Sequence, residues 1–278
     1  MSSSCAFATT HLTPDLQKGL KYWWDFQAPV PTDTDPSDKD YPYKVLPIDY
    51  TGTVGSAFWS QTFKWTPDKN YGQILATAPS QNTPFCKDTA KNPINVLANS
   101  FTLSFDIKNL VSDVDKDVFA LYTNNGTLDA NKLCLHTGAG DSLSLNSNGF
   151  GSTNLTTNPN TGSISAGSGS FPSADQWTTF TITSDGTTIT LYKDGVSMGE
   201  LACTIGADTK ITGIQFGKAF GADDKADKHN ITSADVDNIG IWQRPLTAEE
   251  VQSLTIPEPT TASLCLFGLA TLILRRRK

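Results

Sequence analysis

The sequence predicts an all-β protein built as a two-sheet antiparallel sandwich. Several short segments alternate apolar and polar residues, which is typical of strands that bury one face. Asp-Gly pairs separate some of these segments, as they do in tight β-hairpins. The composition is rich in Thr, Ser, Asn, Asp and Gly, whereas Glu occurs at only four positions. This balance favours strands and turns over helices.

The strand signals follow one another along the chain. Alternating segments occupy Phe101–Ile107, Lys132–Leu135, Ser142–Leu145, Phe180–Thr183 and Ile189–Tyr192. The pairs Asp185-Gly186 and Asp194-Gly195 mark turns, so we expect a three-stranded meander over Trp177–Leu201. Two stretches rich in Gly, Ser, Asn, Asp and Pro are predicted to be loops, namely Asp33–Asp40 and Asn146–Ser170.

One short helix is predicted close to residue 250. Thr247 and Glu250 have the spacing of a capping box, in which the Thr hydroxyl accepts from the Glu amide and the Glu carboxylate reaches back. Val251 and Leu254 give this segment an apolar side. We expect a helix of about one or two turns.

Four segments, in order, resemble the laminin G-like, concanavalin A-like jelly rolls. Asp237–Val251 is similar to the closing strand and short helix of that family. Its opening strand, central strand and Trp-led meander correspond to Leu20–Phe26, Phe101–Lys108 and Trp177–Gly199. The resemblance is patchy between Gln27 and Ser100. It implies that residues 18–255 form one jelly-roll sandwich.

The last segment of the chain, residues 256–278, has three parts. Pro257, Glu258 and Pro259 come first, and the two prolines favour an extended, exposed backbone. An apolar run of about 13 residues follows over Ala262–Leu274, where we expect a short hydrophobic helix. That run is shorter than the roughly 20 residues of a full membrane span. The segment ends with the basic cluster Arg275, Arg276, Arg277 and Lys278, which would stay on the cytoplasmic side.

This layout resembles the PEP-CTERM sorting signal of Gram-negative bacteria. The resemblance implies transient insertion into the inner membrane and recognition by an exosortase-type processing enzyme. The tail would be removed in transit to the outer envelope, the cell surface or an extracellular exopolysaccharide matrix. An ordinary tail anchor is the alternative, although an anchor does not need the Pro-Glu-Pro motif at 257–259.

Export also calls for an N-terminal signal, and residues 1–8 contain the cleavage pattern Ala6-Phe7-Ala8. No basic region or long apolar region precedes this tripeptide. We therefore interpret residues 1–8 as the remnant of a signal peptide whose true start lies upstream, with the mature chain beginning near Thr9. The alternative is a chance tripeptide.

Charge and cysteine usage narrow the classes of partner. The formal net charge is −7 and Arg244 is the only Arg before the tail, so nucleic acid is not expected as a partner. Cys86, Cys134 and Cys203 lie between the two terminal segments. Outside the cytoplasm one disulfide among them is expected, with the pairing open, and the alternative is three small buried hydrophobes. Their wide spacing does not match a zinc motif.

No catalytic set stands out in the sequence. Glycan-cleaving relatives of the resembled fold pair two acidic residues, and the laminarinase-like motif Glu-x-Asp-x-x-Glu is absent here, since Glu200 is the only Glu before Ala248. We expect Asp113, Asp115 and Asp117 to be a solvated cluster in a turn. We interpret His136 as a surface histidine rather than a base.

The resemblance also raises the possibility of bound calcium, since laminin G-like relatives often hold one ion. Asp25, Asp235, Asp237 and Asn238 are the candidate ligands if the opening and closing strands are neighbours. The alternative is that these residues cap their own turns. The sequence leaves both the metal site and the ligand-binding residues open.

Six tryptophans are candidates for stacking on sugar rings. We assign Trp177 and Trp242 to packing, and Trp59 and Trp65 to a possible ligand surface. Taken together, the sequence predicts an exported, lectin-like, non-catalytic protein that binds carbohydrate or another envelope component. The alternatives are a glycan hydrolase with an unrecognised Asp pair and a purely structural matrix component.

Overall fold

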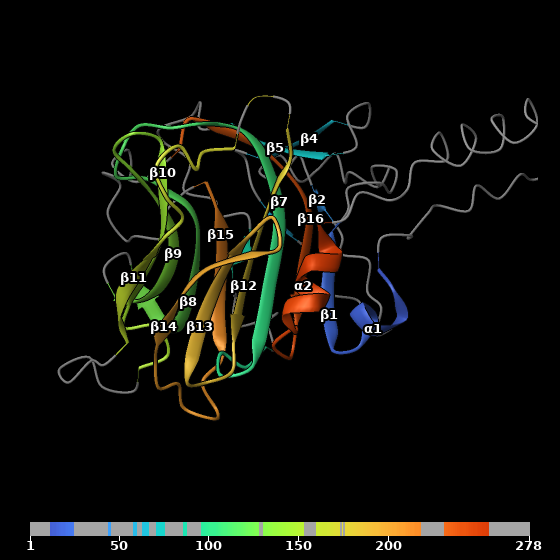
Figure 1. Ribbon diagram of the computed structural model, residues 1–278, viewed down its shortest axis with the longest axis vertical. Coiled ribbons are helices and arrows are strands. Elements are labelled where there is room, and N and C mark those ends of the chain that lie inside the picture. Colours follow the sequence, from blue (N-terminus) through green and yellow to red (C-terminus); the bar gives the residue numbers. More distant parts are fainter. Residues whose placement is uncertain are drawn as a thin grey trace, which may run out of the picture.

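Two antiparallel sheets, stacked face to face, dominate the computed structural model (Figure 1). The predicted two-sheet antiparallel sandwich is therefore confirmed. The structure describes residues 12–24, 44–45, 58–59, 63–66, 71–75, 86–87, 96–127, 130–152, 160–172, 174, 176–217 and 231–255. The predicted signal remnant, the loop at Asp33–Asp40 and the whole sorting segment with its short helix lie outside these residues.

The larger sheet has eight strands, with β7 and β16 near its centre. Hydrogen bonding gives the order β14-β13-β12-β7-β16-β5-β4, and β1 also pairs with β16. The predicted meander is confirmed as β12, β13 and β14. The bounds are β1 (Leu20–Trp24), β4 (Phe63–Thr66), β5 (Tyr71–Leu75), β7 (Phe101–Val111), β12 (Thr178–Ser184), β13 (Thr188–Lys193), β14 (Val196–Ala202) and β16 (Ser233–Trp242).

The smaller sheet has six strands in the order β11-β10-β9-β8-β15-β6. They are β6 (Cys86–Lys87), β8 (Asp117–Thr127), β9 (Ala130–Gly138), β10 (Ser142–Asn148), β11 (Thr161–Ser165) and β15 (Ile211–Phe216). A separate pair joins β2 (Lys44–Val45) to β3 (Phe58–Trp59).

Strand β11 shows that the loop prediction for Asn146–Ser170 was wrong in part. β10 continues to Asn148, and β11 pairs with it through Leu145 and Ile164. β11 lies at the edge of its sheet and buries only Ile164 in the core. Its remaining Gly, Ser and Thr residues are exposed or half-buried. Because only one position needs an apolar side chain, the strand has the composition of a loop.

The core lies between the two sheets and is built by alternate residues of facing strands. Phe105 of β7 packs edge to face on Phe119 of β8 and Phe216 of β15, with ring centroids 5.2 and 5.1 Å apart. All three side chains are buried. Burial of an aromatic side chain contributes about 1.5–3 kcal/mol, and each ring pair adds about 0.5–1.5 kcal/mol.

Two short helices in the described residues flank β1. Thr13 caps α1 (Pro14–Gln17), and Thr247 caps α2 (Ala248–Leu254). The predicted capping box is confirmed: the Thr247 hydroxyl accepts from the Glu250 amide at 3.3 Å, and the Thr247 amide donates to the Glu250 carboxylate at 2.9 Å. Neither helix is long and apolar enough to cross a membrane.

Arg244 holds the two ends of the domain together. Its guanidinium forms a double hydrogen bond to the Glu250 carboxylate, at 2.6 and 2.8 Å, and it also donates to the backbone carbonyls of Asp15 and Lys18. The predicted neighbourhood of opening and closing strands is confirmed, because Trp24 of β1 is paired with Ile239 of β16.

A glycine permits the close approach of two indole rings over β16. Trp23 and Trp242 pack edge to face with their centroids 6.1 Å apart, under α1 and α2. A Cβ on Gly240 would stand 2.4 Å from the Trp242 ring and 2.8 Å from the Trp23 ring. The pair of rings therefore requires glycine at this position.

We predict that Gly240→Ala lowers the free energy of unfolding by about 1–3 kcal/mol, because the added methyl group must displace two buried rings. Urea denaturation followed by tryptophan fluorescence measures this change. Gly213→Ala is the matched control, since its Cβ would meet only ordinary contacts with Tyr122 at 3.6 Å. Equal stability of the two variants would contradict this account.

Candidate functional site

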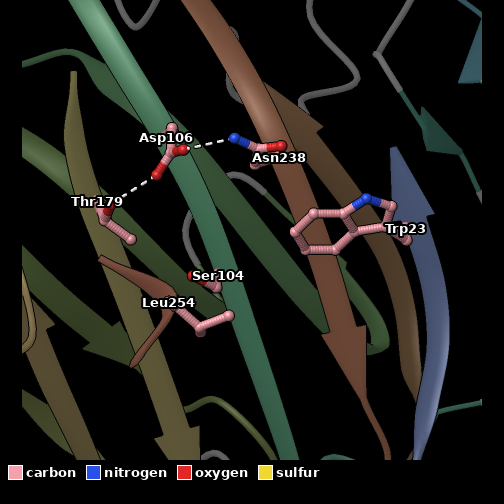
Figure 2. A pocket seen from close by; sticks show the side chains of 6 residues that line it. All are labelled: Trp23, Ser104, Asp106, Thr179, Asn238 and Leu254. Carbon is pink, nitrogen blue, oxygen red and sulfur yellow. Dashed lines mark hydrogen bonds between the residues drawn. The ribbon is translucent and has the colours of Figure 1, made fainter. Parts of the chain in front are cut away.

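A small pocket opens on the outer face of the eight-stranded sheet, the face turned away from the core. Phe105 and Ile107 of β7 point into the core, so Ser104 and Asp106 point outward. The same alternation turns Thr179 of β12 outward, and a register shift in β16 between Asp237 and Gly240 brings Asn238 to the same place. The lining residues are Trp23, Ser104, Asp106, Thr179, Asn238 and Leu254 (Figure 2).

Asp106 is the centre of this pocket. Its Oδ1 accepts from the Thr179 hydroxyl at 2.6 Å and its Oδ2 accepts from the Asn238 side-chain amide at 2.8 Å, as Figure 2 shows. Ser104 shares a hydrogen bond with Thr181 at 2.9 Å. These bonds join β7, β12 and β16, so the polar groups hold fixed directions toward the opening.

The pocket has one apolar side and little volume. Trp23 and Leu254 supply the apolar side, from β1 and the last turn of α2 (Figure 2). The volume is about 30 Å³, which is room for one or two water molecules. One or two hydroxyl groups of a ligand can enter the pocket, whereas the rest of the ligand must stay outside it.

Trp177 stands exposed beyond the pocket, so its assignment to packing was wrong. It immediately precedes β12, and its side chain is 38% exposed. Lys108 lies two residues after Asp106 on the same strand, and its ammonium group is 4.6 Å from the centroid of the Trp177 ring. Trp242, by contrast, is fully buried as expected. The side chains of Trp59 and Trp65 lie outside the described part of the structure.

The calcium candidates are engaged with the protein itself. Asp235 accepts from the Asn109 side chain at 2.7 Å, and Asp237 accepts from the Asn238 amide at 2.8 Å. Asp25 lies outside the described residues. Within the described residues, the one group of three His, Cys, Asp or Glu side chains at ligand distance includes neither Asp235 nor Asp237. The calcium site therefore stays a prediction.

A second polar group occupies the outer face of the six-stranded sheet. Register pairs Asp117 with His136 and Ala120 with Cys134 across β8 and β9. Lys132, Cys134 and His136 alternate with the core residues Leu133 and Leu135, and therefore share the outer face. We call the set Asp115, Asp117, Lys132, Cys134 and His136 the Asp117 cluster.

The Asp117 cluster is an ion-pair network around a buried carboxylate. Asp117 is fully buried, and its two oxygens bond the Lys132 ammonium at 3.0 Å and His136 Nδ1 at 2.9 Å. His136 Nε2 bonds the exposed Asp115 carboxylate at 3.0 Å. A carboxylate buried this deeply persists only because both oxygens have cationic or donor partners.

These contacts move the pKa values of the cluster. The hydrogen bond to Asp117 raises the pKa of His136, although burial opposes it. Burial alone would raise the pKa of Asp117, but the bond to His136 and the Lys132 charge more than offset it, so the value is lowered. Burial and the Asp117 charge raise the pKa of the Cys134 thiol. Both ring nitrogens of His136 face carboxylate oxygens, which only accept when ionised, so this geometry favours the imidazolium, which cannot act as a base.

The sequence interpretation of this region was right for Asp113 and Asp115 and wrong for Asp117. The first two are exposed in the connection between β7 and β8, and Asp115 adopts a positive φ of 65°. Asp117 instead begins β8 and is covered by its partners. The signal that could have shown this was the alternation of Lys132, Cys134 and His136 with buried leucines.

The predicted disulfide is absent among the three central cysteines. Cys134 and Cys203 are both free and buried. Every pairing of Cys86, Cys134 and Cys203 includes at least one of these two, so none of the three pairings forms. The physical reason is their placement, because Cys134 faces outward from the six-stranded sheet while Cys203 packs in the core. The pKa of the Cys203 thiol is raised to about 11 by burial.

The residues predicted to carry the sorting function lie outside the described residues. They are Pro257, Glu258, Pro259, Arg275, Arg276 and Arg277. The described chain ends at Thr255, directly after α2.

Two packed antiparallel sheets with a shared core define a β-sandwich. Residues 87–252 match the laminin G-type family described as the concanavalin A-like lectin/glucanases superfamily. Because the match covers more than half of the chain, the protein belongs to this superfamily. No curated protein matches the sequence.

Several solved structures share the fold at low identity. The binding domain of Paraclostridial Mosquitocidal Protein 1 has a TM-score of 0.53 at 16% identity, and the match covers 86% of this chain and 52% of that chain. Trypanosoma rangeli sialidase, in complex with 2,3-difluoro-KDN, has a TM-score of 0.55 at 12% identity, and the match covers 87% of this chain and 33% of that chain. Botulinum neurotoxin type C, whose cell entry depends on interaction with two ganglioside molecules, has a TM-score of 0.50 at 12% identity. The match covers 87% of this chain and 52% of that chain.

The chain thus spans about half or a third of the length of these structures. At such identities the likeness shows the fold alone.

We predict that His136→Gln costs more stability in mild acid than in alkali in the presence of a chelator. A raised folded-state pKa gives stability that is complete below the unfolded value, about 6.5, and is lost as the pH rises through the folded value. Asp117, whose pKa is lowered, contributes in full at both pH values, because its contribution is lost only as the pH falls below its ordinary value of 3.8 toward the lower folded value. The cost should be about 1–3 kcal/mol at about pH 5.5 and smaller at about pH 9.

Urea denaturation at the two pH values measures this difference. Thr247→Ala is the control, because it removes the α2 cap and no charge that titrates in this range. An equal cost of His136→Gln at both pH values would show that the imidazolium does not stabilise the fold.

Proposed function

We propose that the protein is a non-catalytic carbohydrate-binding protein that uses the Asp106 pocket, and that it works outside the cytoplasm. The observation that carries this proposal is the convergence of a carboxylate, an amide and hydroxyls beside an indole and a leucine in one opening. Carbohydrates present vicinal hydroxyls next to apolar C–H faces, so they need both kinds of contact at once.

Asp106 can recognise a sugar hydroxyl while it keeps its own partners. A carboxylate has about four acceptor sites on its two oxygens, so a ligand hydroxyl can donate to Asp106 beside or in exchange for a present donor such as Thr179 or Asn238. The Asn238 side-chain oxygen accepts from none of the described residues and offers a second acceptor. A hydroxyl that donates to Asp106 gains a charge-assisted hydrogen bond, which is stronger than a neutral one.

The size of the pocket limits what it can hold. With about 30 Å³ it admits one or two hydroxyls and not a whole pyranose ring. Because Trp23 is only 4% exposed, the ring would rest at the opening mainly against Leu254, and further residues of the glycan would extend toward the exposed Trp177. This geometry favours recognition of the side or end of a chain.

The membership of the superfamily supports the carbohydrate class. Its description joins lectins with glucanases, and the similar folds include a sialidase and a neurotoxin that interacts with gangliosides. These are properties of those proteins, and they support the proposal because the same fold carries the pocket here.

Binding without turnover is proposed because the described residues of the pocket offer one carboxyl group. Glycosidases with an acid and a nucleophile or base need two carboxyl groups across the substrate. Among the described residues, Asp106 is the single acidic residue that lines the opening, and both its oxygens already accept hydrogen bonds. Asp117 of the second cluster is fully buried and therefore out of reach of a glycosidic bond.

We predict that the purified full chain binds a subset of glycans on an array and that Asp106→Asn weakens this binding about 10- to 100-fold. The substitution removes the charge and sets an amide donor against the Asn238 amide. Asp113→Asn, in the exposed connection between β7 and β8, makes the same charge change as a control. Circular dichroism confirms that both variants are folded.

Each outcome of the array separates the candidate functions. Release of reducing sugar from any bound glycan would establish the hydrolase and overturn the non-catalytic proposal. Absence of binding with and without added calcium would favour a structural matrix component. If Asp106→Asn leaves glycan binding unchanged, the glycan does not bind in the Asp106 pocket.

Residues 256–278 are proposed to deliver this domain to the outer envelope or an exopolysaccharide matrix. The Pro-Glu-Pro motif, the apolar run and the basic cluster support recognition by an exosortase-type enzyme during transient insertion into the inner membrane. In this proposal the pocket binds the glycans that the protein meets there.

We predict that replacing Pro257, Glu258 and Pro259 by Ala leaves the protein uncleaved in the inner-membrane fraction of a host that carries such an enzyme. Thr260→Ala with Thr261→Ala is the matched control next to the motif. Fractionation with immunoblotting measures both position and size. An unchanged distribution of the Pro-Glu-Pro variant would exclude this route of sorting.

A further inference from the structure

We propose that Asp117, Cys134 and His136 form a binding site for one divalent transition metal ion of the Zn²⁺ type. One ligand atom from each of these side chains, a carboxylate oxygen, the thiol sulfur and a ring nitrogen, lies within 4.8 Å of the other two. The proposal is independent of what the Asp106 pocket binds, because the two sites lie on the outer faces of different sheets.

The distances are close to those that a metal ion requires. Zn²⁺ bonds nitrogen and oxygen at about 2.0–2.2 Å and sulfur at about 2.3 Å, so tetrahedral ligands stand roughly 3.3–3.8 Å apart. His136 Nδ1 and Asp117 Oδ1 are already 2.9 Å apart and would separate slightly. No two of the ligand atoms are more than 4.8 Å apart, so they must approach by no more than about 1–1.5 Å, which rotations of the Cys134 and His136 side chains can supply.

The outer partners already stand where a metal site needs them. Asp115 accepts from His136 Nε2, so the imidazole would present Nδ1 to the metal while a carboxylate holds its far side. Lys132 bonds Asp117 Oδ2 and leaves Oδ1 for the ion. Metal binding would therefore replace the hydrogen bond between Asp117 and His136. The bonds from Lys132 to Asp117 and from His136 to Asp115 would remain.

Charge balances in both forms of the cluster. Without metal, two carboxylates face the Lys132 ammonium and the His136 imidazolium, and the thiol is neutral. With the ion bound, Nδ1 and the thiol each release one proton to solvent. The dipositive ion and Lys132 then face Asp115, Asp117 and the Cys134 thiolate, so the net charge is again zero. The cation at Lys132 is part of this balance and no obstacle to it.

The thiol adds a third kind of ligand atom to the cluster. Hydrogen bonds among Asp115, Asp117, Lys132 and His136 join β8 to β9, and the Cys134 thiol contacts Asp117 and Lys132. Cys134 lies at ligand distance from Asp117 and His136 and is 2% exposed. A nitrogen, oxygen and sulfur set suits Zn²⁺ and its neighbours and is a poor match for Ca²⁺ or Mg²⁺, which prefer oxygen alone.

Titration of the full chain with Zn²⁺ and Co²⁺ tests this site, after removal of metals by a chelator and with thiols kept reduced. We expect one ion per chain, a rise in melting temperature, and a thiolate-to-cobalt absorption band with Co²⁺. Cys134→Ser should abolish the band and weaken Zn²⁺ binding by more than about 100-fold, and Asp115→Asn should weaken it by about 10- to 100-fold.

Cys203→Ser is the matched control, since Cys203 is also free and buried but lies in the core away from the cluster. Its affinity and band should equal those of the unchanged protein. His136→Gln provides a second ligand variant if Cys134→Ser fails to fold. Zn²⁺ binding that both ligand variants leave unchanged, or a cobalt band that persists without Cys134, would overturn the proposal. The absence of any stoichiometric binding would do the same.

Discussion

The two-residue period of the central strand β7 is the constraint on which both the core and the pocket depend. Phe105 and Ile107 point inward and form part of the core, while Ser104 and Asp106 point outward and line the pocket. A shift of one residue in the pairing of β7 with β12 or β16 would exchange these two sets. The burial that stabilises the sandwich therefore also fixes the position of Asp106.

The outer faces of the two sheets each hold a carboxylate, Asp106 on one and Asp117 on the other, and they stabilise it in different ways. Asp106 is half-buried and accepts hydrogen bonds from the neutral donors Thr179 and Asn238, so a ligand hydroxyl can compete with these donors for the carboxylate. Asp117 is fully buried and needs two positively charged partners, Lys132 and His136. The first arrangement suits exchange of neutral hydroxyl ligands, and the second suits replacement of protons by a metal ion.

What the sequence could predict were the features set by local pattern. Asp-Gly turns identified the meander, and the spacing of Thr247 and Glu250 identified the α2 cap, because both depend on a few neighbouring residues. Asp117 and Trp177 were misjudged because their exposure depends on partners far along the chain. Alternation shows which residues share a face, but the pairing of distant strands decides which of those residues are covered and what they contact.

The position of β16 has a mechanical consequence. This strand is hydrogen-bonded to β7 on one side and to β5 and β1 on the other, and α2 follows it directly. Arg244, at the junction, is joined to the α1 segment and to Glu250. A pull on the chain beyond Thr255 would thus act along a strand held on both edges, which must shear two ladders at once.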